Sequence, residues 1–487
     1  MVLRRTKIIT TLGPATDDPK VLEDLIRGGA DVVRLNFSHG GTAEHGARLR
    51  RVTETAEKLG RWVGVLGDLQ GPKIRIDRFI EGKVNLVEGA RFTLDASLDA
   101  DKGTERAVGI SYKQLPDDVT AGDILLLNDG HIVLEVLEVD FHQIHTKVVV
   151  GGELSDRKGI NRHGGGLSAA ALTDKDRADI EMAAEIGVDY LAVSFAASAA
   201  DIELARSLLR EAGGHGHIVA KIERSEAIEN LDEIIEASDG IMVARGDLGV
   251  EMGYAELTGL QKHIIEETRR RNRLVITATQ MMESMISKPI PTRAEVSDVA
   301  NAVIDGTDAV MLSGESAVGK YPVKAVRAMA QVITGAEKYE IAQAPARNRV
   351  DGSFEGTGEA IAMAVMYTAN HLHVKAIVAL TESGSTPLWM SRIRTDIPIY
   401  ALTRHELTRR RVTLYRGIYP VSFDITQPSP QVMYSDIMDT LLEKRLVSAG
   451  ERIILTKGEM SGVAGKTNSM KILKVPDAAG LARTDEG

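Results

Sequence analysis

Eight short apolar runs, each next to a segment with helical periodicity, limit what this chain can fold into more than any other feature. The apolar runs, which we expect to be strands, span 6–12, 32–37, 63–68, 190–195, 218–222, 241–245, 274–279 and 309–313. The helical segments span 19–29, 43–59, 174–187, 199–212, 226–237, 256–272, 293–305 and 323–337. Eight strands that alternate with helices predict a (β/α)8 TIM barrel.

Several of these helices have a recognisable start. A Ser or Thr followed three residues later by an acid predicts a capping box. Three pairs fit this spacing: Thr173 and Asp176, Ser198 and Asp201, and Thr292 and Glu295. Pro19 and Pro322 suit the first turn of a helix, so they support two further starts.

The interval from Gly71 to about Ser168 breaks the alternation. It has no helical period, only short alternating segments such as 133–139 and 147–150, so we expect a small all-β domain inserted after the third strand. Glycines at both ends, Gly71 and 164–166, are typical of hinges. A barrel keeps its chemistry at such loops, so we interpret the insertion as a hinged cap over an active site, with a passive decorative domain as the alternative.

A second, smaller α/β pattern follows residue 343. Strands are expected at 375–380, 397–402, 417–422, 452–457 and 470–475, and helices at 357–372, 386–394, 404–411 and 431–448. We therefore divide the chain into a barrel (1–70 and 169–342), an inserted β domain (71–168) and a C-terminal, mostly parallel α/β domain (343–487). The last dozen residues are expected to fray.

Composition excludes several classes of function. The formal net charge is −10, which argues against a general nucleic-acid binder. There are no cysteines, so disulfides, thiolate catalysis and zinc ribbons are excluded. The chain starts without an apolar signal core, and no run approaches the roughly 18 apolar residues of a membrane span. We expect a cytoplasmic protein that binds neither nucleic acid nor membrane.

Charged residues close two of the barrel strands. Lys221 and Glu223 are two residues apart in an extended run, so both side chains should leave the same face, and Asp247 follows the next strand. A cation and two carboxylates at adjacent strand ends predict a site for phosphate and a divalent metal. The alternatives are a structural ion pair for Lys221 and a helix cap for Asp247.

The remaining strand ends are rich in cations and hydroxyls. They carry Arg34, Asn36, Ser38, His39, Asp68, Arg245, Thr279, Gln280, Ser313 and Glu315. This mixture suits phosphoryl transfer, which needs positioning and charge neutralisation, better than glycoside hydrolysis, which needs paired acids. For Ser313 and Glu315 an alternative is that they form a turn that only supports the residues around the metal.

Six motifs in this order resemble pyruvate kinases. They are Arg34-Leu-Asn-Phe-Ser-His-Gly40, Lys221-Ile-Glu223, Ala244-Arg-Gly-Asp-Leu-Gly-Val250, Ala278-Thr-Gln-Met-Met-Glu-Ser-Met285, Lys288-Pro-Ile-Pro-Thr-Arg-Ala-Glu-Val-Ser-Asp-Val-Ala-Asn301 and Met311-Leu-Ser-Gly-Glu315. The resemblance runs from Thr6 to about Val475. It implies transfer of a phosphoryl group from phosphoenolpyruvate to ADP, which yields pyruvate and ATP, in a homotetramer.

The resemblance also implies roles for single residues. Lys221 stabilises the transferring phosphoryl group, while Glu223 and Asp247 hold Mg²⁺, for which Mn²⁺ can substitute. The N–H groups of Gly246 and Asp247, with the hydroxyl of Thr279, receive the substrate carboxylate, and Thr279 takes part in protonating the enolate. The other substrate contacts are Arg34, Arg75 and Ser194, and the nucleotide contacts are Arg34, Asn36, His39 and Lys158.

Two departures from the family pattern stand out. Where the family carries Asp-Thr-Lys-Gly-Pro-Glu, this chain has Asp68-Leu-Gln-Gly-Pro-Lys73. We expect the Lys73 ammonium, beside Asn36, Ser38 and Asp68, to replace a bound K⁺, so that K⁺ is not required. The return hinge, 158–166, is looser and more polar than in the family, which makes the role of Lys158 less secure.

The C-terminal domain carries a candidate effector loop. Leu380-Thr-Glu-Ser-Gly-Ser-Thr386 follows a strand and opens a helix, where hydroxyls and a glycine can form a phosphate nest. It resembles the family's effector loop, and we expect Thr381, Glu382, Ser383, Gly384, Ser385 and Thr386 to bind a sugar monophosphate or AMP. A capped turn is the alternative. A second glycine-rich loop, 458–465, could close over the ligand.

Two other functions remain as alternatives. One is a barrel lyase that acts on phosphoenolpyruvate or pyruvate through a Mg²⁺-bound enolate. The other is a non-catalytic metabolite sensor that uses the C-terminal domain alone. The inserted domain and Lys221 favour the kinase over the lyase, and the complete set of strand-end residues argues against the sensor.

Overall fold

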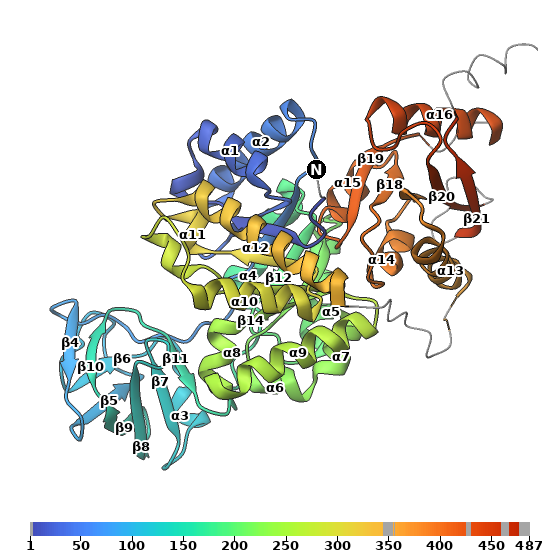
Figure 1. Cartoon of the computed structure of the whole chain (residues 1–487). Coiled ribbons are helices and arrows are strands. Elements are labelled where there is room, and N and C mark those ends of the chain that lie inside the picture. The colour runs from blue at the N-terminus through green and yellow to red at the C-terminus, as the bar shows by residue number, and fades with distance from the viewer. Residues whose placement is uncertain (1–2, 344–353, 355, 425–429, 459–466, 477–487) are drawn as a thin grey trace, which may run out of the picture. The chain divides into compact units, whose positions relative to one another are not determined.

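The computed structural model describes residues 3–343, 354, 356–424, 430–458 and 467–476 (Figure 1). The chain forms two compact units. The first comprises Met1–Leu35, Ala43–Leu66 and Met281–Gly487, and the second Asn36–Thr42 and Gly67–Gln280. Within the described ranges, no helix combines the length and the apolar content needed to cross a membrane.

The eight predicted barrel strands are present and close into a barrel, so that prediction is confirmed. Their order around the barrel is β1-β16-β15-β14-β13-β12-β3-β2. The strands are β1 (Lys7–Thr11), β2 (Val32–Asn36), β3 (Gly64–Asp68), β12 (Tyr190–Val193), β13 (His217–Ile222), β14 (Gly240–Ala244), β15 (Leu274–Ala278) and β16 (Ala309–Leu312). Neighbouring strands are parallel, which brings their carboxyl ends to one edge.

The helices that alternate with these strands begin where the capping signals predicted. In all three predicted boxes the acid accepts a hydrogen bond from the N–H of the cap residue, as Asp176 does from Thr173 at 2.9 Å. The helices are α1 (Pro19–Gly28), α2 (Thr42–Lys58), α4 (Asp174–Ile186), α5 (Ala199–Glu211), α6 (Ser225–Glu229), α7 (Leu231–Ala237), α8 (Arg245–Met252), α9 (Tyr254–Arg270), α10 (Arg293–Asp305), α11 (Gly314–Ala317) and α12 (Pro322–Gln343), with 3₁₀ turns η1 (Pro14–Thr16) and η2 (Glu283–Ile286).

Several of these helices differ from the predictions, among them the short helix α11, which was not expected. The segment 226–237, expected as one helix, forms α6 and α7 with Asn230 between them. Helix α8 was not predicted at all. It starts directly after β14 and therefore carries Gly246 and Asp247, which we had expected at the end of the strand.

The interval 71–168 is all-β apart from a single helical turn, as predicted. A six-stranded sheet in the order β11-β7-β8-β9-β5-β6 lies beside a two-stranded sheet of β10 and β4. The elements are β4 (Lys83–Leu86), β5 (Arg91–Asp95), β6 (Ala107–Gly109), α3 (Leu115–Asp118), β7 (Ile124–Leu127), β8 (Ile132–Asp140), β9 (Gln143–Val150), β10 (Gly152–Ser155) and β11 (Ile160–Arg162). Alternate residues such as Phe92, Leu134 and Ile144 form a separate buried core. We call this part the β insertion.

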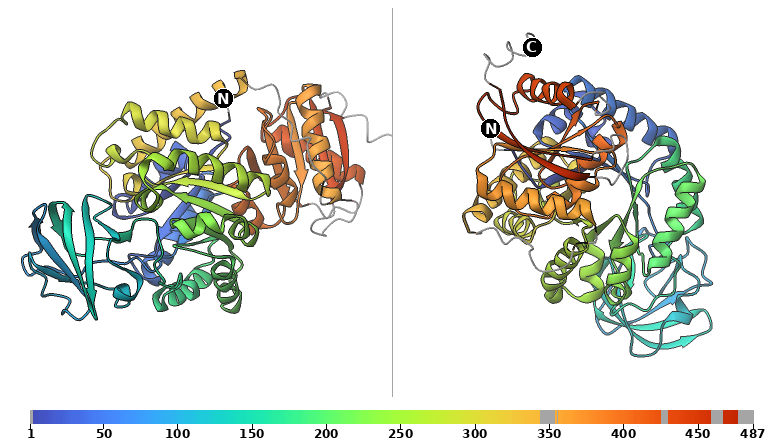
Figure 2. Two further views of the ribbon diagram at one scale, coloured as in Figure 1. Left: turned by 90° about the horizontal axis from the view of Figure 1, so that it is seen from below. Right: turned by 90° about the vertical axis from the view of Figure 1, so that its right-hand side faces the viewer.

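The C-terminal part is the predicted α/β domain. Its sheet has the order β19-β18-β17-β20-β21, in which only β21 runs antiparallel. The elements are β17 (Ala376–Leu380), β18 (Ile399–Thr403), β19 (Ile418–Ser422), β20 (Arg452–Gly458), β21 (Thr467–Lys474), α13 (Thr357–Leu372), α14 (Ser385–Ser391), α15 (Glu406–Val412) and α16 (Pro430–Glu443). Figure 2 shows helices on both faces of this sheet. Residues 459–465 of the second glycine-rich loop and the tail from 477 lie outside the described residues.

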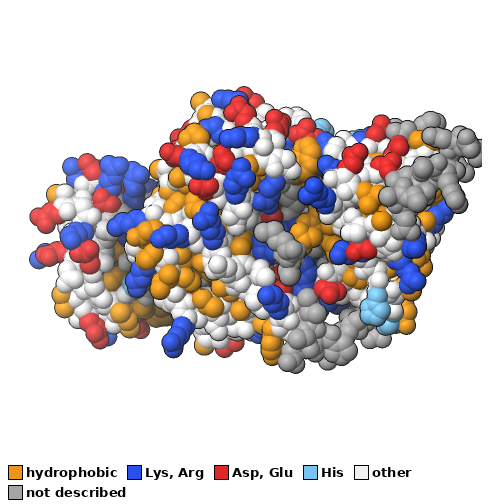
Figure 3. All heavy atoms as spheres, turned by 45° about the horizontal axis from the view of Figure 1, so that its top comes forward, with side chains coloured by type: hydrophobic (Ala, Val, Ile, Leu, Met, Phe, Trp, Pro, Cys, Tyr) orange, Lys and Arg blue, Asp and Glu red, His pale blue; other side chains and the backbone are white. Residues whose placement is uncertain are grey.

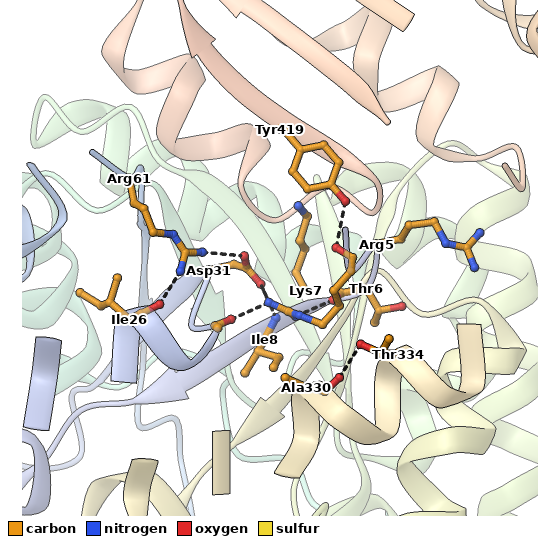
Figure 4. Close-up of polar contacts among 12 residues, drawn as sticks. Arg5, Thr6, Lys7, Ile8, Ile26, Asp31, Arg61, Ala330, Thr334 and Tyr419 are labelled. Carbon is orange, nitrogen blue, oxygen red and sulfur yellow. Dashed lines mark hydrogen bonds and ion pairs between the residues drawn. The ribbon is translucent and has the colours of Figure 1, made fainter. Parts of the chain in front are cut away.

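The C-terminal sheet is joined to the start of the first barrel strand. Lys7, the first residue of β1, donates a hydrogen bond to the carbonyl oxygen of Ile418 at 2.6 Å, and its ammonium lies 4.5 Å from the ring centre of Tyr419 (Figure 4). Burial lowers the pKa of Lys7 to about 8. The hydroxyl of Tyr419 donates in turn to the carbonyl of Arg4 at 3.0 Å. These contacts fix the edge strand β19 to the chain segment that enters the barrel.

Candidate active site

Lys221 lies at the carboxyl end of β13 among three oxygen atoms. Its ammonium is 3.0 Å from Glu223 Oε1 and 3.2 Å from Asp68 Oδ1, and it donates to Ser194 Oγ at 2.6 Å. The side chains of Glu223 and Asp68 are only 3% and 1% exposed. One ammonium between two buried carboxylates leaves a net negative charge, which a further cation would balance.

Glu223 is held in place by the backbone of the neighbouring strand end. Its Oε2 accepts a hydrogen bond from the N–H of Phe195 at 2.8 Å. Burial raises the pKa of Glu223, the charge of Lys221 opposes that rise, and the negative charges of Asp247 and Asp68 add to it. A buried acid whose pKa is raised by neighbouring negative charges is typical of a position where a cation binds.

The start of α8 is tied to the end of β15. The N–H of Gly246 donates to Thr279 Oγ1 at 2.8 Å, and that hydroxyl donates to the carbonyl of Ala278 at 2.6 Å. Thr279 and Gln280 have φ angles of +67° and +54°, which is a strained backbone for residues with a Cβ, above all for a β-branched one. This strained turn holds the Thr279 hydroxyl at the first turn of α8.

Lys73 binds a carboxylate other than the one we expected. Its ammonium lies 2.8 Å from Asp247 Oδ1, with side-chain exposures of 25% and 19%. The expectation that Lys73 pairs beside Asn36, Ser38 and Asp68 is therefore corrected, because Asp68 already pairs with Lys221. The ammonium of Lys73 is bound to a carboxylate of α8 instead.

The other predicted residues have separate surroundings. Arg34, on β2 in the first unit, donates to Thr11 Oγ1 at 3.0 Å, and Asn36 Oδ1 accepts from the N–H of Ser38 at 3.2 Å. His39 is exposed. Arg75 donates to the carbonyl of Arg157 at 2.9 Å, inside the β insertion. In the described part of the chain, neither Arg75 nor Lys158 makes a side-chain contact with the Lys221 cluster.

Comparison with known proteins decides the family. A model described as "Pyruvate kinase, barrel domain" matches residues 3–326, and one described as "Pyruvate kinase, alpha/beta domain" matches residues 359–473. The chain belongs to the pyruvate kinase family. It is therefore a phosphotransferase, and the family's reaction converts phosphoenolpyruvate and ADP into pyruvate and ATP.

Whole-chain relatives agree with this membership. The chain is 55% identical to "Pyruvate kinase II" of Salmonella typhimurium over 97% of its own length and 99% of that protein. It is 53% identical to "Pyruvate kinase" of Haemophilus influenzae with the same coverage, and 42% identical to "Pyruvate kinase" of Geobacillus stearothermophilus over 97% of this chain and 81% of the relative.

The carboxylates of this pyruvate kinase fit a magnesium ion that is completed by substrate and water. No group of three or more His, Cys, Asp or Glu side chains is placed to hold a metal among the residues described. Mg²⁺ does not need such a cage, because it commonly takes one or two carboxylates together with substrate phosphates and water. Glu223 and Asp247 are the two carboxylates that would supply such a donor set.

One buried acid of the site was missed by sequence reasoning. Glu251 on α8 accepts hydrogen bonds from Asn161 Nδ2 at 3.3 Å and from the N–H of Ser225 at 3.1 Å. It is only 4% exposed, and burial raises its pKa to about 7. Glu251 follows Asp247 by four positions, a spacing that places both side chains on one face of a helix. This spacing is informative only if 245–252 is recognised as helical.

The carboxylate of Glu315 is held by the backbone around it. Glu315 Oε1 accepts from the N–H of Met282 at 3.0 Å, and Oε2 accepts from the N–H of Ser313 at 2.7 Å. Both carboxylate oxygens are thus engaged by backbone, and Glu315 is 2% exposed. In the structure Glu315 supports the turn between β16 and α11.

The candidate effector loop forms a tight turn between β17 and α14. Thr381 Oγ1 accepts from the N–H of Gly384 at 2.9 Å, and the hydroxyls of Ser383 and Ser385 lie 2.9 Å apart. Gly384 has a φ of +90°, and a Cβ there would approach the Val412 side chain to 3.1 Å, so the turn requires glycine. Glu382 pairs with His405 and, at 3.6 Å, with Arg404, which brings two basic side chains to the loop.

Proposed function

We propose that in this chain Lys221 neutralises the charge that develops on the phosphoryl group as it passes from phosphoenolpyruvate to ADP. The observation that carries the proposal is the Lys221 ammonium, held by Glu223, Asp68 and Ser194 at the strand ends. Positioned charge is the main catalytic requirement of phosphoryl transfer. A coupled assay with phosphoenolpyruvate and ADP tests the reaction. In the variant Lys221→Met we expect turnover to be lost and substrate binding to be kept.

We propose Glu223 and Asp247 as the ligands of Mg²⁺, with Mn²⁺ as a substitute. When bound, the ion neutralises part of the substrate's negative charge. The buried, raised-pKa carboxyl of Glu223 supports this assignment, because a bound cation would hold it ionised. Isothermal titration of the chain with Mn²⁺ should show one site per chain, which Glu223→Gln removes. Unchanged Mn²⁺ affinity in that variant would contradict the assignment.

The substrate carboxylate is proposed to bind at the start of α8. The N–H groups of Gly246 and Asp247 lie in the first helical turn, where backbone donors lack partners within the helix. Here Thr279 Oγ1 accepts from the N–H of Gly246 and donates its own proton to the carbonyl of Ala278. A bound carboxylate would replace the first bond, and the hydroxyl would turn from Ala278 to deliver its proton to the enolate and would regain a proton from solvent. Further substrate contacts are assigned to Arg34, Arg75 and Ser194, and nucleotide contacts to Arg34, Asn36, His39 and Lys158.

The enzyme is proposed to work without K⁺. The ammonium of Lys73, on Asp247, supplies a fixed positive charge in the part of the site where the family pattern has an acid, and Leu69 lacks the hydroxyl that would help to bind the ion. Activity with tetramethylammonium as the monovalent cation should equal activity with KCl. A large stimulation by KCl would overturn the proposal.

The loop 381–386 is proposed to bind a phosphorylated effector, either a sugar monophosphate or AMP. Its three closely spaced hydroxyls and the basic residues Arg404 and His405 support an anionic ligand. Ser383→Asp would add a negative charge and should abolish activation. If that variant responds to every tested phosphometabolite as the parent does, the assignment is wrong.

The quaternary and cellular assignments are also proposals. We propose a cytoplasmic homotetramer, built from the barrel (1–70 and 169–342), the β insertion as a cap (71–168) and a C-terminal regulatory domain (343–487). Light scattering measures the tetramer directly. The lyase alternative predicts turnover of phosphoenolpyruvate or pyruvate without ADP, and the sensor alternative predicts no turnover, so the coupled assay separates all three.

A further inference from the structure

A cavity of about 1380 Å³ opens at the amino ends of the parallel strands of the C-terminal sheet. Three of the segments that line it precede strands: 373–375 before β17, 394–398 before β18 and 450–451 before β20. Leu3 and Arg5, just before β1, line it as well. The loop 381–386 follows the carboxyl end of β17, so the cavity lies at the opposite edge of the sheet.

The lining of the cavity is strongly cationic. Two acids, Asp396 and Glu451, face six basic side chains: Arg5, Lys375, Arg394, Arg445, Arg452 and Lys474. The whole chain has a net charge of −10, and Figure 3 shows basic and acidic side chains interspersed over the face that it displays. An excess of one sign in a concave site concentrates the electric field there and attracts ions of the opposite sign.

Some of these cations are fixed in position before any ligand arrives. Arg5, which is 8% exposed, donates to the carbonyl of Thr395 at 2.7 Å, and Arg394 donates to the carbonyl of Ile304 at 2.9 Å. These carbonyl oxygens orient the two guanidinium groups, and Arg5 also pairs with the carboxylate of Glu337 at 3.9 Å, which offsets part of its charge. Figure 4 shows the Arg5 side chain pointing away from Lys7. Preorganised charges of this kind lower the entropic cost of binding an anion.

The cations of the cavity differ in whether they have an acidic partner. Lys375 is paired with Glu451 at 3.4 Å, but Arg445 and Arg452 form no ion pair within the described part of the chain. Both are exposed at the rim. Structural ion pairs therefore do not account for the presence of Arg445 and Arg452 at this cavity.

We propose that this cavity binds a small molecule that carries a chain of two or more phosphoryl groups. Such a group brings several negative charges into a small volume, which matches the excess of cations in the lining better than a single phosphate does. Val374, Ile397 and Leu446 give the lining an apolar part that can accept an organic portion of the ligand. The site is separate from the proposed effector loop and does not rest on the proposed function.

The ligand would also contact the entrance to the barrel. The backbone N–H groups of Arg5 and Thr6 donate to the carboxylate of Glu337 on α12, at 3.0 Å and 2.6 Å. Arg5 thus joins the cavity wall to the segment that leads into β1. Binding should therefore slow the local opening of this segment as well as of the cavity rim.

Hydrogen–deuterium exchange with inorganic tripolyphosphate as the probe tests the proposal in the full-length protein. We expect protection of 394–398 and 445–452 at a constant ionic strength, and none with orthophosphate at the same concentration. The double variant Arg445→Glu and Arg452→Glu should weaken binding about tenfold or more. Lys444→Glu, an exposed lysine next to the cavity but outside its lining, is the matched control and should bind as the parent does.

Two further outcomes would overturn the proposal. One is protection that appears only at 381–386 or in the barrel, since the probe would then occupy another site. The other is an equal loss of affinity in Lys444→Glu, which would reduce the effect to general surface charge. Retention of the protection in Ser383→Asp is expected, because the two sites lie at opposite edges of the sheet.

Discussion

Lys73 and Asp247 join the β insertion to helix α8 through an ion pair of 2.8 Å. One turn further along the same helix, Glu251 accepts a hydrogen bond from Asn161, which lies on the last strand of the insertion. The segments that enter and leave the insertion are thus fixed to positions i and i+4 of one helix. Since α8 also carries a proposed metal ligand, the placement of the insertion is coupled to that ligand.

Removal of the Lys73 charge should impair turnover when K⁺ is absent. With tetramethylammonium as the monovalent cation, we expect Lys73→Met to lower kcat about tenfold or more, because a positive charge near the transferring phosphoryl group is lost. Lys83→Met removes an exposed lysine of the insertion and serves as the control. The double variant Leu69→Thr and Lys73→Glu should gain stimulation by KCl. Full turnover of Lys73→Met under these conditions would contradict the assigned role.

Lys221→Met should reduce stability as well as turnover. The variant removes the ammonium from between the buried carboxylates of Asp68 and Glu223, at a cost of about 3–5 kcal/mol. Adding Asp68→Asn should recover part of the thermal midpoint but none of the activity. If stability and activity recover together, Lys221 is a structural residue and its catalytic role is wrong.

For turnover, the hydroxyl of Thr279 should matter more than the shape of its side chain. Thr279→Val removes the hydroxyl that bonds to the N–H of Gly246 and to the carbonyl of Ala278, and it should lower kcat by about two orders of magnitude or more. Thr279→Ser keeps the hydroxyl and should retain most of the activity. Exchange of the methyl protons of pyruvate with solvent measures the proton-transfer step alone, so unchanged exchange in Thr279→Val would exclude Thr279 from that step.

Glu251 should make folding stability fall as pH rises. Its pKa is raised from 4.5 to about 7 in the folded chain, so the folded state favours the protonated acid. This contribution is fully present below about pH 4.5 and is lost as pH passes through 7. Relative to the parent, Glu251→Gln should therefore gain thermal stability between pH 5 and pH 8. The exposed Glu256→Gln should show no such trend, and a pH-independent difference for Glu251→Gln would refute the prediction.

The sequence predicts the barrel strands closely because their signal is local. Each strand is a short apolar run that ends at a polar residue, and the observed bounds differ from the predicted ones by no more than two residues. The capping boxes at Thr173, Ser198 and Thr292 depend on four neighbouring residues and were predicted for the same reason.

Features that depend on distant parts of the chain were not predictable in this way. Helix α8 contains Gly246 and Gly249, which are poor helix formers, and is stabilised by contacts with Thr279 and Asn161. The positive φ angles of Phe195 and Thr279 follow from the closed barrel rather than from local propensity. The ion pair of Lys73 with Asp247 was missed because no sequence pattern shows that Asp68 already pairs with Lys221.

The hydrogen bonds at the base of the β insertion have a consequence for how this chain can be altered. The N–H of Gly71, where the insertion begins, donates to Asp176 on the helix that follows it, at 3.0 Å, and the N–H of Leu69 donates to the carbonyl of Ala192 at 3.0 Å. The barrel thus holds the two ends of the β insertion close together. The entropic cost of closing the chain between these ends therefore changes little with the length of the insertion. A short linker could replace the whole insertion without changing the strand register, which makes it an exchangeable module.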